Sequence, residues 1–234
     1  MDELTVRRAV RDAYAGRASG SGCGPTGVAC CAPDAGTPGA PDDLPSLGVG
    51  DPVGSADLRP GETVLDLGSG PGRDVLHAAG LVGPSGRAIG VDATPEMVFR
   101  ARESARDRGI RNAEFRLGEI EHLPVESGCV DVVLSDCVVN LSPDKAAVFR
   151  EAFRVLRPGG RVVLSDVVAE AELPASVRED ARAWAGCVAG AVSEATYLEL
   201  LRGTGFQDVR TVRKGGTFTG LVSTTLLTAR KPPA

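Results

Sequence analysis

Short apolar runs alternate with amphipathic stretches along most of the chain. The apolar runs predict five strands, within residues 62–68, 86–93, 113–120, 129–137 and 160–168. Between them, the spacing of apolar side chains predicts helices within residues 73–81, 95–109 and 143–160. Strands that alternate with helices in this way are typical of a parallel sheet that is covered by helices on both faces.

The two ends of the chain follow different patterns. Residues 1–19 have the apolar spacing of a short helix, whereas residues 20–59 are rich in Gly, Pro, Ser and Asp and are expected to form a loop that is partly disordered. After the fifth strand, the pattern predicts a helical stretch from Pro174 to about Gly203 and then a closing pair of strands. We therefore divide the chain into residues 1–59, an N-terminal helix and a flexible Gly/Pro/Cys-rich arm, and residues 60–234, a single α/β domain.

Composition narrows the class of protein. The chain has 234 residues, 42% of them hydrophobic and 24% charged, with a net charge of −5. This balance argues against a nucleic-acid partner, and no apolar run approaches the ~18 residues that a membrane span needs. We see no signal peptide and expect a cytoplasmic protein. In a reducing compartment, its six cysteines are more readily explained as ligands, reactive thiols or buried filler than as disulfides.

A glycine-rich turn follows the first predicted strand in the stretch VLDLGSGPGRD. It contains Gly68, Gly70 and Gly72, and Asp66 comes two residues before the first of them. Small residues at the carboxyl end of a strand let the backbone approach a ligand closely. The spacing is G-x-G-x-G, which differs from the G-x-G-x-x-G turn of dinucleotide-binding proteins, so an NAD-linked oxidoreductase is disfavoured.

Acidic side chains also end the next two predicted strands. Asp92 ends the second, where its carboxylate can accept both hydroxyls of a ribose. Glu119 ends the third, within reach of an adenine amino group, and Ile120 is expected beside the ring. Glu121 and His122 follow in the loop, and the sequence assigns them no role.

Together these strand ends resemble the class I S-adenosylmethionine methyltransferases, over roughly residues 60 to 230. The resemblance implies a Rossmann-like fold: a seven-stranded, mostly parallel sheet with an antiparallel last strand and helices on both faces. It also implies S-adenosylmethionine as the cofactor, held by the turn, Asp66, Asp92, Glu119 and Ile120.

The cysteines bear on the methyl acceptor. Cys137 directly follows the fourth predicted strand, beside the expected methyl donor, where a cysteine could be packing filler, redox switch, nucleophile or ligand. Cys187 lies in the helix predicted after the fifth strand, and Cys30 and Cys31 lie on the arm. Thiolates select soft ions, and the paired spacing typical of zinc sites is absent. A trivalent arsenic centre takes three thiolates and keeps the lone pair that a methyltransferase needs.

The stretches SDCVVNLSPDK, FREAFRVLRPGGRVVLSDVV and WAGCVAGA resemble bacterial arsenite S-adenosylmethionine methyltransferases. By this resemblance, Cys137 and Cys187 are arsenic ligands, joined by either Cys30 or Cys31. The choice between these two stays open. Cys23 either relays arsenic inward or is idle, and Cys129 is expected to be core filler.

Two positions depart from the pattern of that family. Val49 stands where members often have a cysteine, so that cysteine would be dispensable for a site of three thiolates. Asp136 stands where members commonly have Asn before the fourth-strand cysteine. The carboxylate would add a negative charge near the sulfonium.

The sequence therefore predicts a monomeric arsenite methyltransferase that serves in arsenic detoxification. Its expected partners are arsenite or methylarsenite, carried as thiol conjugates, and a thioredoxin- or glutathione-like thiol reductant. Two alternatives remain: a methyltransferase for a small organic acceptor, and a protein that binds arsenicals without turnover. The number of methyl groups added, the preferred arsenical and a biosynthetic role stay open.

Overall fold

The structure is a computed structural model, and it describes all residues except 19–39, 42, 45 and 219. In the described residues, seven strands form one sheet in the order β3-β2-β1-β4-β5-β7-β6. The strands are β1 Thr63–Leu67, β2 Arg87–Asp92, β3 Ala113–Leu117, β4 Val130–Asp136, β5 Leu156–Ala169, β6 Gln207–Phe218 and β7 Val222–Arg230. Strand β7 pairs antiparallel with both β5 and β6, and the other described strand pairs are parallel. The predicted sheet is confirmed.

Register aligns the carboxyl ends of the central strands. In the parallel ladders, Leu67 at the end of β1 is paired with Val91 of β2 on one side and with Ser135 of β4 on the other. The loops that follow these three strands therefore leave the sheet at the same edge. Open α/β sheets bind their ligands at this edge.

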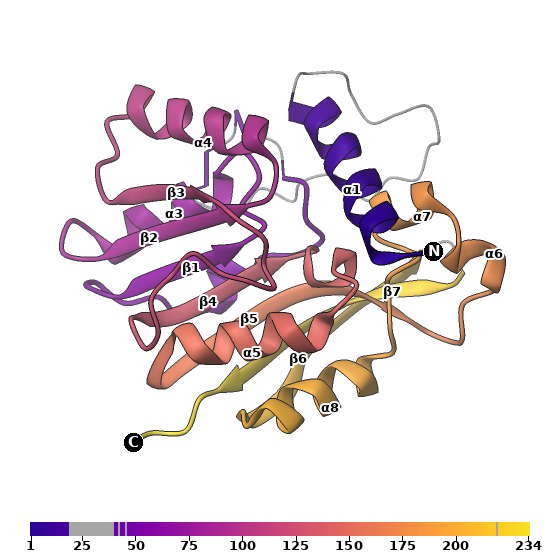
Figure 1. Ribbon diagram of the computed structural model, residues 1–234. Coiled ribbons are helices and arrows are strands. Elements are labelled where there is room, and N and C mark those ends of the chain that lie inside the picture. The colour runs from indigo at the N-terminus through magenta and orange to yellow at the C-terminus, as the bar shows by residue number, and fades with distance from the viewer. Residues whose placement is uncertain (19–39, 42, 45, 219) are drawn as a thin grey trace.

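Helices cover both faces of the sheet (Figure 1). One face carries α2 Pro52–Ser55, α3 Arg73–Val82 and α4 Pro95–Asp107, and the other carries α5 Lys145–Val155 and α8 Glu194–Thr204. The remaining helices are α1 Glu3–Ala18, η1 Val139–Leu141, α6 Ala175–Arg178 and α7 Ala181–Ala185. None of the helices in the described part of the chain is long and apolar enough to cross a membrane.

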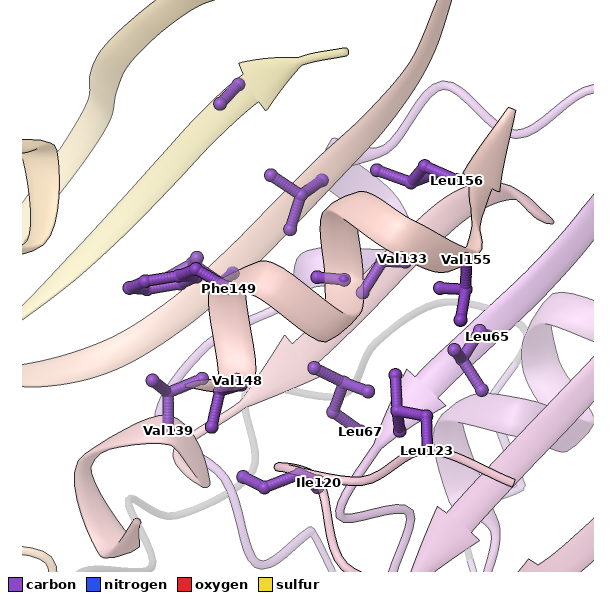
Figure 2. Close-up of a cluster of buried hydrophobic side chains, with 14 of the residues drawn as sticks. Leu65, Leu67, Ile120, Leu123, Val133, Val139, Val148, Phe149, Val155 and Leu156 are labelled. Atoms are coloured by element: carbon purple, nitrogen blue, oxygen red, sulfur yellow. The ribbon is translucent and has the colours of Figure 1, made fainter. Parts of the chain in front are cut away.

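Two apolar clusters pack on opposite faces of the sheet. Alternate residues of a strand point to opposite faces, and adjacent residues of β1 do so here: Leu65 joins one cluster and Val64 the other. Figure 2 shows Leu65, Val148 and Phe149 in the cluster beneath α5. The strands are apolar on both sides because both sides are buried.

Residues before β1 pack more closely than their composition predicts. The short helix α2 lies within the expected loop, and Val53 and Ala56 are buried in the same apolar cluster as α3 and α4. Asp51 caps α2, because its carboxylate accepts a hydrogen bond from the Gly54 amide at 2.8 Å.

The predicted helical stretch from Pro174 to about Gly203 is broken. It contains α6, α7 and α8, separated by turns. The run WAGCVAGA has two glycines, which weaken a helix, and α7 ends at Ala185, just before the first of them. The stretch is helical in part, but Cys187 lies in a turn, so its predicted place in a helix was wrong.

The helix predicted at the N-terminus is present as α1. It lies outside the two helical layers. It contacts α4 and α7 and crosses the edge of the sheet where the parallel strands end (Figure 1). Val6 is its most buried apolar side chain. The helix thus covers the ligand-binding edge of the domain.

Candidate active site

The glycine turn after β1 forms the floor of a pocket. Gly68, Gly70 and Gly72 all have positive φ angles, of 67°, 51° and 93°. A Cβ atom at Gly68 would lie 2.3 Å from Cγ2 of Val138, and one at Gly72 would lie 2.8 Å from the ring of Phe115. Glycine is therefore required at both positions by conformation and by space.

Asp92 closes one side of this pocket. Its carboxylate accepts hydrogen bonds from the Gly70 amide at 2.9 Å and from the Thr94 amide at 2.8 Å. Burial raises the pKa of Asp92, and these two hydrogen bonds only partly offset this rise. Each carboxylate oxygen keeps acceptor capacity for a further donor, so the position fits the predicted contact with ribose hydroxyls.

The loop after β3 supplies the next wall. Strand β3 ends at Leu117, so Glu119 lies two residues beyond the strand end to which the sequence assigned it. Glu119 and Ile120 both line the pocket, and their contact with an adenine ring stays a prediction. The carboxylate of Glu119 is paired with Arg7 at 3.1 Å and with Arg11 at 2.9 Å.

Glu121 lines the same pocket, although sequence reasoning gave it no role. It is buried, and its carboxylate accepts a hydrogen bond from Ser142 at 2.5 Å and pairs with Arg7 at 3.0 Å. His122, in contrast, is not among the residues that line this pocket. Glu121 lies in the loop four residues after the end of β3, and no sequence pattern marked it as buried.

Carboxylates gather at the end of the pocket near β1 and β4. Asp66, Asp74 and Asp136 all line it. Burial raises the pKa of Asp66 well above its ordinary value, and the nearby Asp74 and Asp136 raise it further. This end of the pocket therefore favours a cationic group over an anionic one.

Asp136 also fastens the segment before α2. Its carboxylate accepts hydrogen bonds from the amides of Val49 and Gly50, at 2.8 and 3.2 Å. A Cβ atom at Gly48 would overlap this carboxylate, 1.8 Å from Oδ2. Burial and the nearby Asp74 raise the pKa of Asp136, and the hydrogen bonds from the Val49 and Gly50 amides partly offset this rise. Both departures from the family pattern, Val49 and Asp136, thus meet in one contact.

Cys137 follows β4 directly, as predicted, and lines the pocket. Its side chain is buried, and its φ angle is 59°, in the left-handed region that side chains rarely adopt. Its amide donates to the carbonyl of Ser165 at 2.8 Å. The strained backbone turns the chain at the sheet edge and is held by this contact with β5.

Cys187 lies in the turn after α7, and it is also buried with a positive φ angle, of 61°. Its thiol lies 3.6 Å from the carbonyl oxygen of Cys137, to which it donates. The structure therefore brings together two cysteines that are 50 positions apart. Left-handed backbone at residues other than glycine is concentrated at functional sites.

A polar network that the sequence did not reveal supports these cysteines. Asn140 donates from its side-chain amide to the sulfur of Cys137 at 3.9 Å and to the carbonyl of Cys187 at 3.1 Å. The Asn140 backbone amide and the Tyr197 hydroxyl both donate to Asp166, each at 3.0 Å. A charged residue within the apolar run VVLSDVV was the available signal for this network.

Two charged members of this network are buried. Burial raises the pKa of Asp166, and its hydrogen bonds and the Lys145 ammonium only partly offset this rise. Burial lowers the pKa of Lys145, and the nearby carboxylates of Asp166 and Glu121 only partly offset this decrease. The Lys145 ammonium donates to the backbone carbonyls of Asn140 and Ser142, at 3.2 and 2.9 Å. It therefore fixes the loop that follows Cys137.

Helix α1 forms the roof of the site. Arg7, Val10, Arg11 and Tyr14 line the pocket from one face of this helix. The Tyr14 hydroxyl lies 3.8 Å from the sulfur of Cys187. The side chains thus connect the cofactor end of the pocket with the cysteine end, and their helical spacing was the signal for a shared face.

The other cysteines are placed in part. Cys23, Cys30 and Cys31 lie outside the described residues. Cys129, predicted to be core filler, is partly exposed immediately before β4 and packs against the apolar cluster beneath α5. Its thiol donates to the carbonyl of Glu126 at 3.1 Å. Within the described part of the chain, no group of three or more His, Cys, Asp or Glu side chains is placed to hold a metal ion.

Comparison with protein families matches residues 58–210 to the methyltransferase domain family. Among curated proteins, the arsenite methyltransferase of Halobacterium salinarum is 45% identical over 91% of this chain and 60% of its own length. The arsenite methyltransferase of Aquipseudomonas alcaligenes is 44% identical over 66% of this chain and 47% of its own length. The chain thus spans about half to three fifths of these relatives.

A solved structure supports the same relationship. The arsenic(III) S-adenosylmethionine methyltransferase of Chlamydomonas reinhardtii superposes with a TM-score of 0.71 and is 37% identical. The match covers 82% of this chain and 71% of that one. A phosphoethanolamine N-methyltransferase of Haemonchus contortus, solved with S-adenosyl-L-methionine, has a TM-score of 0.63 at 19% identity, which is a likeness of fold alone.

Proposed function

Because the chain belongs to the class I S-adenosylmethionine-dependent methyltransferase family, and within it resembles the arsenite methyltransferases in sequence and structure, we propose that it transfers methyl groups from S-adenosylmethionine to trivalent arsenic. The single observation that carries the proposal is the contact between Cys137 and Cys187. Cys137 lines the pocket that the glycine turn and Asp92 also form, and the buried Cys187 thiol lies behind it, against the Cys137 carbonyl.

The donor set of the pocket fits S-adenosylmethionine. This cofactor supplies an electrophilic methyl group on a sulfonium when it is bound. Asp92 would hold the ribose, the loop of Glu119 and Ile120 would hold the adenine, and the carboxylates near Asp66 would attract the cationic methionine portion. A carboxylate cluster is poorly suited to the pyrophosphate of a dinucleotide, because like charges repel.

Cys137 and Cys187 would hold the arsenic. Thiolates are soft ligands that suit a thiophilic centre, and a trivalent arsenic bound by thiolates keeps a lone pair that can act as the nucleophile. The two residues come from separate loops at the sheet edge, so both must be in place for a two-point attachment. Their burial excludes water from the bound arsenic and favours a fixed approach to the methyl group.

A third thiolate would complete the site for arsenite. We assign it to Cys30 or Cys31, with Cys23 as a relay or idle. The expected substrates are arsenite and methylarsenite as conjugates of small thiols. A thioredoxin- or glutathione-like reductant would keep the thiols reduced, the protein would act as a monomer, and the role would be detoxification.

Arsenic speciation tests the proposal. Purified protein is incubated with arsenite, S-adenosylmethionine and glutathione, and the products are separated by chromatography with detection of arsenic. We expect methylated arsenic species and an equivalent amount of S-adenosylhomocysteine. Binding of arsenite without any methylated product would favour an arsenical-binding protein instead. Methylation of a phenol, amine or carbon acid that survives loss of Cys137 would favour the organic acceptor.

A further inference from the structure

Asn140 is the residue that links the two cysteine-bearing loops. We propose that it is a positioning residue that sets the distance and orientation of the Cys137 and Cys187 thiolates for a trivalent arsenical. The inference rests on the proposed function, since it concerns how the arsenic ligands are held. It gives a role to a side chain that lies three residues after Cys137, in the short helix η1.

The orientation of the Asn140 amide is determined by its neighbours. Its nitrogen lies 3.1 Å from the carbonyl oxygen of Cys187, and two oxygen acceptors cannot hydrogen-bond to each other. The NH₂ group must therefore face Cys187, and its second hydrogen is available to the sulfur of Cys137, at 3.9 Å. A single amide thus donates to both loops. Because thiolate formation increases the acceptor strength of the sulfur, this contact strengthens when Cys137 is deprotonated.

The loop of Cys187 lies directly against Asn140. A Cβ atom at Gly190 would lie 1.9 Å from the carbonyl oxygen of Asn140 and 2.5 Å from the ring of Trp184. Only glycine permits this approach. The turn that carries Cys187 is therefore seated on the backbone of Asn140 as well as on its side chain.

Asn140 is itself held rigidly from the other side. Its backbone amide donates to Asp166, which also accepts from the Tyr197 hydroxyl, and the Lys145 ammonium donates to the Asn140 carbonyl. Asn140, Asp166 and Tyr197 are fully buried. A group held by several buried hydrogen bonds can impose its geometry on a softer neighbour.

The two halves of the Asn140 side-chain amide differ in their hydrogen bonding. The buried Oδ1 has no hydrogen-bond donor among the described residues. An unsatisfied buried acceptor costs stability, and an apolar side chain of similar size would avoid the cost. The NH₂ group, in contrast, donates to both cysteine-bearing loops. We therefore take these two contacts as the reason for an amide at this position.

The test uses phenylarsenite, a probe that takes two thiolates. Cys23, Cys30 and Cys31 are first changed to Ser, so that Cys129, Cys137 and Cys187 are the remaining cysteines. Trp184 is the single tryptophan of the chain, and its carbonyl accepts from the Cys187 amide at 3.0 Å. Its fluorescence therefore reports binding beside Cys187. Calorimetry with S-adenosylmethionine provides the second affinity.

Asn140→Asp and Asn140→Leu are the test variants, and Asn112→Asp is the matched control. Asn112 also donates from its side-chain amide to two backbone carbonyls, of Ala79 and Gly83, each at 2.9 Å, but outside the pocket. We expect both Asn140 variants to weaken phenylarsenite binding at least tenfold, while their affinity for S-adenosylmethionine stays within twofold. Asn112→Asp should change neither affinity.

Two outcomes would overturn the inference. Affinity for phenylarsenite within twofold of the parent in both Asn140 variants would remove the positioning role. If both variants lose affinity for phenylarsenite and for S-adenosylmethionine to the same extent, Asn140 serves only to fold the loop. Failure of the proposed function is distinguishable, because the parent would then bind phenylarsenite equally well after Cys137→Ser or Cys187→Ser.

Discussion

The guanidinium of Arg7 lies 3.0 Å from the carboxylate of Glu121. This contact joins helix α1 to the loop after β3 across the cofactor end of the pocket. The Glu121 side chain is only 2% exposed, and that of Arg7 is 23% exposed. Because Arg7 also pairs with Glu119, one arginine neutralises two acids of the pocket wall. The N-terminal helix is therefore an integral wall of the site.

Arg7→Ala should destabilise the fold. It leaves the buried carboxylate of Glu121 without its arginine, and hydrogen bonds to charged groups contribute about 1.5–3 kcal/mol. We expect the free energy of unfolding to fall by about 1–3 kcal/mol in urea titrations. Arg8→Ala is the matched control, since Arg8 is exposed on the same helix and should leave stability nearly unchanged. Equal effects of the two substitutions would contradict the role assigned to Arg7.

Asp92→Ala should weaken binding of S-adenosylmethionine. Loss of charge-assisted hydrogen bonds costs roughly 1.5–3 kcal/mol, which corresponds to a loss of affinity of roughly ten- to a hundredfold. Calorimetry on the purified variant measures this directly, and Asp107→Ala, an exposed acid on α4, serves as control. Unchanged affinity in Asp92→Ala would remove the assignment of this residue to the cofactor.

Gly68→Ala should disrupt the site more than its backbone strain alone explains. Gly109 has nearly the same φ angle, 66°, but a Cβ atom there would meet nothing within 4 Å. Gly109→Ala should therefore cost only the left-handed strain, about 1–2 kcal/mol. Gly68→Ala adds an overlap with Val138 and should cost about 1–3 kcal/mol more. Thermal unfolding and cofactor affinity check both values. Equal losses of stability in the two variants would show that the Val138 side chain moves aside at no cost.

The sequence predicted the sheet and its cofactor edge because both depend on local patterns. Apolar runs such as CVDVVLSDC that alternate with helices are typical of a covered parallel sheet, and polar residues that end them meet at one edge by register. Asp92 and Cys137 were located in this way. Their position follows directly from the strand that precedes each of them.

Contacts between distant segments could not be read from the pattern. The turn at Cys187 was predicted as helix because its apolar residues have helical spacing. The pattern does not show that the backbone at Cys187 is left-handed or that Gly190 packs against Asn140 and Trp184. The roof formed by α1 was also missed. Its apolar face predicts burial, but nothing in that pattern specifies that Tyr14 packs against Cys187.

Cys30 and Cys31 should matter for arsenite and not for methylarsenite. Arsenite offers three sites to sulfur, whereas methylarsenite already carries one methyl group and offers two. Changing both residues to Ser should suppress turnover of arsenite and spare methylarsenite. Initial rates with each substrate under reducing conditions check this prediction, with Cys23→Ser run alongside. Equal loss on both substrates would show that the pair acts in some way other than as the third ligand.

The rate of methylarsenite methylation by Cys137→Ser tests the thiolate mechanism most directly. A hydroxyl is too hard and too weakly acidic to replace a thiolate on arsenic. Cys129→Ser is the control, because that residue is partly exposed immediately before β4, and it should retain nearly full activity. We expect no dimethylated arsenic above background from Cys137→Ser, with cofactor affinity retained. Turnover by Cys137→Ser at the rate of the parent protein would contradict it.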